Sequence, residues 1–248
     1  MVAIVTGATA GFGLEITRKF VAQGKKVVAI GRRADRLQAL VAELGPAVHP
    51  VALDLRDTDA IAALPQSLPD AFSEVTILVN NAGLALGMET AQEAHWADWQ
   101  TMVDTNITGL IATTRAFLPG MVERQVGHIV NIGSVAGTYP YAGGNVYGAT
   151  KAFVKQFSLN LRADLFRTPL RVTNIEPGLV GGTEFSQVRF HGDEQRAASR
   201  YEGVKALDAT DIAEAVSWVV NLPAHVNINR LEIMPIGQSF SALSIDRK

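Results

Sequence analysis

Residues 6–13 read TGATAGFG, and this stretch decides the fold. It directly follows an apolar run, residues 2–5, typical of a buried strand, and it leads into a segment of helical period. Gly7, Gly11 and Gly13 allow a tight turn and close backbone approach, and the first amides of a helix favour an anion. The stretch therefore predicts a site for the pyrophosphate of a dinucleotide. The alternative is no more than a tight turn between a strand and a helix.

Further apolar runs alternate with segments of helical period along the whole chain. The runs are almost continuous in Val, Ile and Leu, so helices should cover both faces of the sheet. We predict a single-domain, Rossmann-like α/β protein with a doubly wound parallel sheet of about seven strands flanked by helices. The domain spans residues 1–248, with a cofactor half at 1–132 and a catalytic and substrate half at 133–248. Predicted strands are 2–5, 26–30, 48–53, 76–79, 128–132, 170–175 and 231–234, and predicted helices are 12–23, 35–44, 57–68, 98–124, 147–166 and 210–221.

Single residues mark the ends of several predicted helices. Asp35, Asp57 and Thr210 stand where N-caps belong, because their side-chain oxygens can accept hydrogen bonds from the first free amides. Gly24 and Gly45 stand where a helix often ends in a left-handed residue.

The composition excludes several classes of protein. Of 248 residues, 48% are hydrophobic and 19% charged, which suits a globular domain and not a disordered chain. With 22 Lys and Arg against 24 Asp and Glu, the net charge of −2 predicts neither a nucleic acid nor a membrane surface as partner. There is no cysteine, no signal-like segment after Met1, and no run near the ~18 apolar residues of a membrane helix. We therefore expect a cytoplasmic protein.

Arg32 and Arg33 end the second predicted strand, about 20 residues beyond Gly13. A site for NAD has an acid at this place, which accepts hydrogen bonds from the ribose hydroxyls. Two guanidinium groups would instead clamp a 2′-phosphate, so we predict NADP as the cofactor. The competing acid, Asp35, is explained more simply as a helix cap. Two solvated arginines at the end of a strand are the alternative.

Tyr147 and Lys151 lie four residues apart in a predicted helix and therefore share one face. Ser134, thirteen residues before Tyr147, follows the fifth predicted strand at the sheet edge that carries the glycine turn. A phenol titrates near pH ~10, and a neighbouring ammonium together with an oxidised nicotinamide would lower its pKa. We predict Tyr147 as the general acid/base, with Ser134 bonded to the reacting oxygen. By itself, the Tyr–Lys pair could equally be a surface pair.

These motifs resemble those of the short-chain dehydrogenase/reductase family over nearly the whole chain. The TGATAGFG turn resembles the family's cofactor turn, and NNAG at residues 80–83 resembles its turn beside the cofactor. Ser134, Tyr147 and Lys151 match its catalytic triad. The resemblance implies that Asn106 is a fourth catalytic residue, which holds a water in a proton relay from the lysine. Lys151 is then expected also to bind the nicotinamide ribose.

The resemblance also implies which residues bind the cofactor. Asp54 and Leu55 would contact the adenine side, and Pro177 would open the segment over the nicotinamide. The family often has P-G-x-x-x-T, but here Gly182 takes the threonine position and Thr183 follows it, which leaves a contact of Thr183 with the carboxamide open. The implied cofactor-binding residues are Gly7, Thr9, Gly11, Phe12, Gly13, Arg32, Arg33, Asp54, Leu55, Asn81, Gly83, Tyr147, Lys151, Pro177, Gly178, Val180 and Thr183.

Residues 80–89, 134–153, 176–190 and 222–229 resemble a narrower group in the family, the bacterial NADP-dependent 3-hydroxy acid dehydrogenases. This likeness implies a small 3-hydroxy acid as substrate, such as serine, allo-threonine or 3-hydroxypropionate, or malonic semialdehyde in reduction. The family resemblance implies a homo-oligomer, commonly a tetramer. Two alternatives stay open, a reductase of neutral ketones and a non-catalytic NADPH-binding protein.

Arg189 lies in the least regular stretch, residues 176–201, at the predicted ligand end of the sheet. Its guanidinium could pair with a substrate carboxylate, and a solvated loop arginine is the alternative. Trp96 and Trp99 are expected to pack in the core or at a subunit interface. The five histidines lack metal-binding spacing, so no metal site is predicted.

Overall fold

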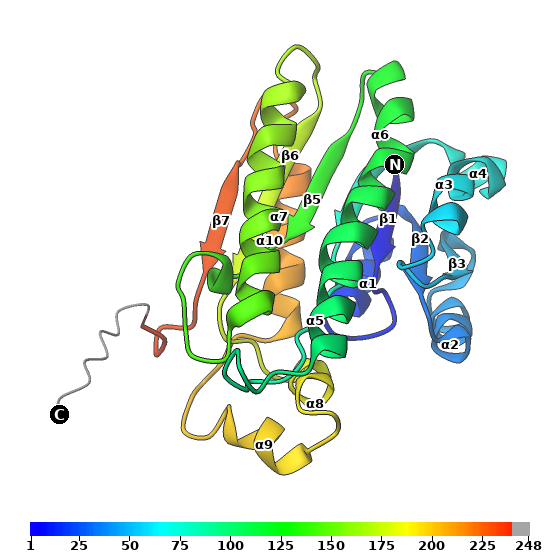
Figure 1. Cartoon of the computed structure of the whole chain (residues 1–248). Helices are drawn as coiled ribbons and strands as arrows, with labels where there is room; N and C mark the ends of the chain where they lie inside the picture. Colours follow the sequence, from blue (N-terminus) through cyan, green and yellow to red (C-terminus); the bar gives the residue numbers. More distant parts are fainter. Residues whose placement is uncertain (240–248) are drawn as a thin grey trace, which may run out of the picture.

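Seven parallel strands form one sheet in the computed structural model, which describes residues 1–239 (Figure 1). Their order in the sheet is β3-β2-β1-β4-β5-β6-β7. The predicted doubly wound, Rossmann-like sheet is confirmed. The strands are β1 (Val2–Thr6), β2 (Lys26–Gly31), β3 (Val48–Ala52), β4 (Val75–Asn80), β5 (His128–Ile132), β6 (Arg171–Pro177) and β7 (Arg230–Ile233).

Helices cover both faces of the sheet, and each face has its own hydrophobic core. Successive residues of β1 show why its sequence is apolar throughout: Val5 packs in one core and Ile4 in the other. The first core contains α1 (Gly11–Ala22), α2 (Ala34–Leu44) and α10 (Ala209–Asn221), and the second contains α3 (Thr58–Ser67), α6 (Leu110–Glu123) and α7 (Asn145–Asp164). Figure 1 shows α6 and α7 in front of the strands and α1 and α10 behind them. Phe20 of α1 and Met121 of α6 are fully buried, each worth ~1.5–3 kcal/mol of hydrophobic stabilisation.

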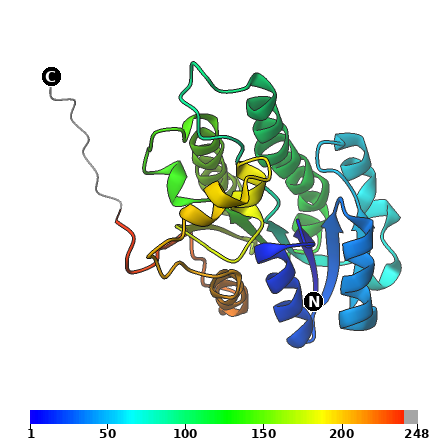
Figure 2. The ribbon, with the colours of Figure 1, turned by 90° about the horizontal axis from the view of Figure 1, so that it is seen from below.

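The remaining elements are short, and several modify the predicted ones. The predicted helix 98–124 is a continuous run of α5 (Trp96–Val103), a π-helical stretch η2 (Asp104–Gly109) and α6. Residues 176–201, which we call the flap, are less irregular than predicted, because they contain α8 (Phe185–Arg189) and α9 (Glu194–Ser199). Figure 2 shows α8 and α9, in yellow, lying across the carboxyl ends of the strands. The other short elements are η1 (Gly45–Ala47), α4 (Asp70–Ser73) and η3 (Val135–Gly137). Within residues 1–239, every helix is too short or too polar to span a membrane.

Two of the predicted helix caps are wrong. Arg33 is the N-cap of α2, so Asp35 lies within the first turn. Asp208, not Thr210, caps α10, because Asp208 forms a reciprocal capping box with Asp211. An acid two residues earlier thus outcompetes the threonine. The confirmed helix-end positions are Asp57, Gly24 and Gly45.

The strand order reverses between β1 and β4, and the turns after these two strands are tied together. The Thr6 hydroxyl accepts hydrogen bonds from the amides of Asn81 and Ala82, both at 3.0 Å, and donates to the Val79 carbonyl at 3.3 Å. In an open parallel sheet, ligands bind at such a reversal, outside the carboxyl ends of the strands. The fold therefore places the candidate site here.

Candidate active site

The glycine turn after β1 leaves the N-terminus of α1 open. Gly7 has a φ of 69°, which only glycine adopts freely, and a β-carbon on Gly13 would lie 2.2 Å from the Gly7 carbonyl oxygen. Ala10, the N-cap of α1, provides no side-chain hydrogen bond, and the first turn contains no acid. The free amides at this end therefore have no capping partner from a side chain, which fits a phosphate. Asn81 fixes the turn from the side, since its amide nitrogen donates to the Thr6 carbonyl at 2.8 Å.

Ser134, Tyr147 and Lys151 meet at the carboxyl end of β5. Ser134 caps η3 directly after the strand, and its hydroxyl accepts a hydrogen bond from the Ala136 amide at 3.1 Å. Tyr147 and Lys151 lie on the first two turns of α7 and are only 8% and 6% exposed. The Lys151 ammonium donates to the Ile132 carbonyl at 2.8 Å and lies 5.9 Å from the centre of the Tyr147 ring. The structure therefore brings the three predicted catalytic side chains together.

The ionisation of this cluster differs from the prediction. Burial raises the pKa of Tyr147 to about 12, although a hydrogen bond with Ser134 acts against it. Burial also lowers the pKa of Lys151 to about 8. The expected lowering of the tyrosine pKa by the lysine is therefore wrong for the protein alone, because desolvation of the phenolate dominates. The positive charge of Arg189 acts in the direction of the phenolate, and the positive charge of an oxidised nicotinamide would add to it.

Asn106 sits in the π-helical stretch η2 and is 1% exposed. Its amide group exchanges two hydrogen bonds with the backbone of Leu84, at 2.9 and 2.8 Å, and donates to the Thr150 hydroxyl at 3.1 Å. A β-carbon on Gly83 would lie 3.2 Å from the amide oxygen of Asn106 and 3.4 Å from the Lys151 nitrogen. Asn106 thus fixes the NNAG turn against the catalytic helix. Its part in a proton relay stays a prediction.

The arginines after β2 are held by an acid of the flap. Arg33 donates from Nη1 to Glu184 at 2.8 Å and from Nη2 to the Thr9 hydroxyl at 3.3 Å, and Arg36 donates to Glu184 at 2.7 Å. Burial raises the pKa of Glu184, but the hydrogen bonds from the two arginines outweigh it and lower the pKa overall. Arg32 is exposed. Glu184 was not predicted, because a single acid in an irregular stretch forms no pattern. Arg36 was not predicted either.

The residues predicted on the adenine side follow β3. Asp54 forms an ion pair with Arg56 at 2.6 Å, and this hydrogen bond is the main cause that lowers the pKa of Asp54. Leu55 is buried against η2, where a β-carbon on Gly109 would lie 2.8 Å from it. Their contact with a cofactor stays a prediction.

The predicted cofactor residues of the flap are held by contacts with β7, with Leu207 and with the glycine turn. Gly178 donates from its amide to the Ile233 carbonyl at 2.7 Å, which fixes the start of the flap beside Pro177. Val180 forms an isolated parallel bridge with Leu207. The methyl group of Thr183 lies against the glycine turn, 3.3 Å from where a β-carbon on Gly11 would be.

Arg189 is buried, so the alternative of a solvated loop arginine is wrong. It is 6% exposed at the end of α8, and its guanidinium donates to the Gly87 carbonyl at 3.1 Å and to the Tyr141 hydroxyl at 2.8 Å. The guanidinium carbon lies 5.6 Å from the centre of the Tyr147 ring. A fixed positive charge thus stands beside the predicted acid/base. Gly87 and Tyr141 were not predicted, although both lie in stretches that carry the resemblance.

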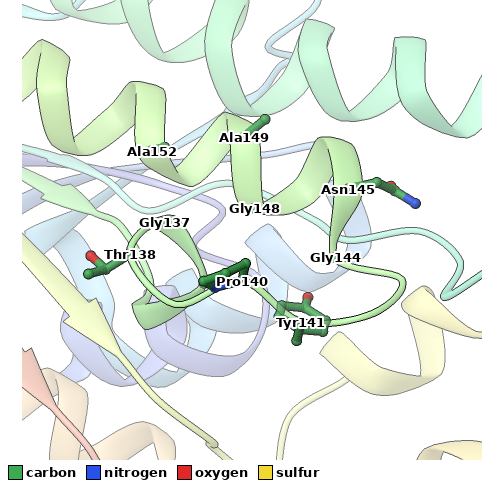
Figure 3. Close-up of a pocket in the computed structure, with 10 residues that line it drawn as sticks. Gly137, Thr138, Pro140, Tyr141, Gly144, Asn145, Gly148, Ala149 and Ala152 are labelled. Carbon is green, nitrogen blue, oxygen red and sulfur yellow. The ribbon is translucent and has the colours of Figure 1, made fainter. Parts of the chain in front are cut away.

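Tyr141 belongs to a loop that packs closely on α7 (Figure 3). The loop and the helix border a hollow of about 480 Å³, whose lining includes Gly137, Gly144 and Gly148. A β-carbon on Gly137 would lie 2.6 Å from the backbone of Lys151, so only glycine permits this approach. The small residues therefore set the distance between the loop that carries Ser134 and Tyr141 and the helix that carries Tyr147.

Two side expectations concern residues outside this cluster. Trp99 packs beside a small core that contains Met102 and Tyr147, whereas Trp96 is 72% exposed. Within residues 1–239, no three His, Cys, Asp or Glu side chains gather in a way that could hold a metal ion.

The chain is similar to known dehydrogenases in sequence and in structure. The profile of the short chain dehydrogenase family matches residues 1–194. An NADP-dependent 3-hydroxy acid dehydrogenase of Escherichia coli (strain K12) is 61% identical, with 100% of both chains covered. A serine 3-dehydrogenase of Agrobacterium fabrum is 52% identical over 99% of this chain and 98% of its own. The closed form of a serine dehydrogenase complexed with NADP+ has a TM-score of 0.99 at 61% identity, with 100% of both chains covered. Because this TM-score covers the whole length of both chains, the structural similarity extends to the flap.

Proposed function

The chain belongs to the short-chain dehydrogenase family, and we propose that it transfers hydride between NADP and the hydroxyl-bearing carbon of a small 3-hydroxy acid. Serine, allo-threonine and 3-hydroxypropionate are the candidate substrates in oxidation, and malonic semialdehyde is the candidate in reduction. Two relatives named for 3-hydroxy acids and for serine, at 61% and 52% identity, support this substrate class. The solved relative that contains NADP+ supports the cofactor.

The observation that carries the proposal is the buried charge of Arg189. Its guanidinium donates from Nε and Nη2 to neutral oxygens, and no ion pair joins it to any acid within residues 1–239. A buried cation without a counter-charge is costly, and a carboxylate could supply both the charge and an acceptor for Nη1. Because Arg189 lies beside Tyr147, the carboxylate and the reacting hydroxyl must be close together, as in a short 3-hydroxy acid.

The proposed mechanism uses the buried side chains in fixed roles. In oxidation, Ser134 and Tyr147 bond the substrate hydroxyl, and Tyr147 takes its proton as phenolate. Arg189 orients the acid by its carboxylate. The ammonium group of Lys151 supplies a positive charge near the Tyr147 ring and a hydrogen-bond donor for the nicotinamide ribose. NADP+, when bound, supplies the hydride acceptor.

The cofactor fits the residues that would hold it. The N-terminus of α1 lacks a side-chain cap, which suits a pyrophosphate. Arg32 and Arg33 offer guanidinium donors to a 2′-phosphate, as the sequence predicts.

The experiment that tests the substrate class compares 3-hydroxypropionate with its uncharged amide in the variant Arg189→Ala. A charge-assisted hydrogen bond contributes about 1.5–3 kcal/mol, so the KM for the acid should rise ~10–150-fold, with a much smaller change for the amide. Arg200→Ala, an exposed arginine of the flap, is the matched control and should change neither. Equal losses on the acid and the amide would assign the carboxylate to another donor.

The assembly is also a proposal. Trp96, Phe166 and Trp218 are 72%, 65% and 50% exposed in the single chain, which suits burial between subunits. We expect a homotetramer, and light scattering should give four times the 26.5 kDa of one chain.

A further inference from the structure

The flap touches the cofactor side of the site before it reaches the substrate side. Thr183 lies against the glycine turn, and the next residue, Glu184, accepts the hydrogen bonds of Arg33 and Arg36. Helix α8 then begins, and it ends at Arg189, the proposed carboxylate anchor. A single short helix therefore links the arginines of the 2′-phosphate site to the arginine of the substrate site.

The charged side chains around Glu184 have a net positive charge, which favours the binding of a dianion. Arg33 and Arg36 share this one carboxylate, and Arg32 is exposed next to them. The nearby Asp54 is paired with Arg56. The three arginines and Glu184 thus carry an excess of about two positive charges. Asp35 in the first turn of α2 reduces it to about one, and this excess attracts a phosphate monoester with a charge of about −1.5 to −2.

The geometry lets Glu184 and a phosphate share Arg33. Nη1 of Arg33 points to Glu184 and Nη2 to Thr9, so two fixed acceptors set the plane of the guanidinium. Nη2 also donates to the Thr9 carbonyl at 3.4 Å. Because a guanidinium has five N–H donors, the Nε–H and the second Nη1 hydrogen of Arg33 are then available. Arg36 holds the second oxygen of Glu184, which keeps the carboxylate in place while Arg33 binds an anion.

We propose that Glu184 is a positioning residue that couples recognition of the 2′-phosphate by Arg33 to the seating of the flap, and thereby of Arg189, over the substrate. The proposal rests on the proposed use of NADP. By linkage, a 2′-phosphate on Arg33 stabilises the seated flap, and the seated flap strengthens 2′-phosphate binding by the same factor. A cofactor without the 2′-phosphate lacks this coupling.

The test measures binding and amide exchange, not turnover. Adenosine 2′,5′-bisphosphate is the probe, and AMP (adenosine 5′-monophosphate) is the matched ligand without a 2′-phosphate. In the wild type, the bisphosphate should slow hydrogen exchange of residues 185–201 about 5-fold or more, and AMP should not. In Glu184→Gln the slowing should disappear, and the Kd of the bisphosphate, measured by calorimetry, should rise by a similar factor while that of AMP stays unchanged.

Glu194→Gln is the matched control, since it removes an exposed carboxylate of the same flap, and it should behave as the wild type. Equal slowing in Glu184→Gln and wild type would overturn the coupling. Tighter binding of the bisphosphate by Glu184→Gln would also overturn it, because the carboxylate would then compete with the phosphate for Arg33. If the wild type binds the bisphosphate no better than AMP, the NADP proposal fails together with the coupling.

Discussion

The catalytic side and the cofactor-phosphate side of the site differ in how far their polar and charged side chains are exposed to solvent. Tyr147 and Lys151 are 8% and 6% exposed and lie on a long helix packed against the sheet. The side chains of Arg33 and Glu184 are 39% and 37% exposed, and they meet as an ion pair. Charges in the first region are hardly screened, whereas those in the second are screened by water and salt.

Because of this difference in exposure, the buried region is suited to proton transfer and the exposed region to binding an anion. Burial is strong enough to raise the pKa of Tyr147 to about 12 and to lower that of Lys151 to about 8, so protons in this region respond to a single added charge. The exposed arginines attract an anion over a distance and release it again. Substitution of Tyr147 should therefore change chiefly kcat, whereas substitution of Arg32 or Arg33 should change the KM for the cofactor and its dependence on salt.

The largest effect should come from Tyr147→Phe, which removes the proton donor and leaves the ring. The ring keeps its edge-on contact with Phe185, at 5.8 Å between centres, so the fold should persist. We expect kcat to fall about 10³-fold or more, with the Kd of NADPH nearly unchanged. Stopped-flow turnover and fluorescence titration measure the two quantities.

Tyr139→Phe is the control for this substitution, because the Tyr139 hydroxyl donates to Glu232 at the surface. It should retain turnover. If Tyr147→Phe kept more than about a tenth of the wild-type rate, the acid/base assignment would be wrong.

The next largest effect should be on the choice of cofactor. One or two charge-assisted contacts to a 2′-phosphate should favour NADP over NAD by about 10²–10⁴-fold in kcat/KM. The variant Arg32→Ala, Arg33→Ala should narrow this ratio chiefly by raising the KM for NADP, with NAD turnover little changed. Added salt should erode the preference of the wild type, because both arginines are at the surface.

Steady-state kinetics with both cofactors, at low and high salt, measure this preference. Arg115→Ala, which removes an exposed arginine of α6, should leave it unchanged. A wild type that uses NAD as well as NADP, or a double variant that keeps the preference, would remove the arginines from the cofactor site.

The sequence predicts the strands and the catalytic helix better than the partners of the arginines, and the reason is physical. The strands follow from local apolar runs, and Tyr147 and Lys151 follow from helical spacing, which are properties of neighbouring residues. The partner of Arg33 is Glu184, 151 positions away, and that of Arg189 is Gly87, 102 positions away. Such pairs arise only from the folded chain, so no spacing could indicate them.

The pKa of Tyr147 shows the same limit within the buried region. The sequence places Lys151 one turn away, which predicts a lowered pKa. The fold adds the desolvation of the phenol, which raises the pKa of Tyr147 instead. Residue types and spacing therefore identify the catalytic groups, but the sign of a pKa shift depends on burial.

The smallest expected effect concerns stability, and it tests whether burial of charge governs the catalytic region. Burial lowers the pKa of Lys151 from 10.5 to about 8, so between these pH values the unfolded chain binds more protons and wild-type stability rises with pH. Lys151→Met removes the buried ammonium, fills a similar volume and loses the hydrogen bond to Ile132. At ~1.4 kcal/mol per pKa unit, less ~1 kcal/mol for that bond, the variant should be roughly 1–3 kcal/mol more stable than the wild type at pH 7. This advantage should shrink toward pH 10, because the wild-type lysine is then neutral in the folded state.

Urea denaturation at pH 7 and pH 9.5 measures the difference in stability. Lys155→Met is the control, one turn further along α7, where the lysine donates to Gly137 and Thr138, and it should show no such pH dependence. A variant that is less stable at both pH values by the same amount would show that the ammonium of Lys151 is well solvated in the folded protein, which would place it with the exposed arginines and not with Tyr147.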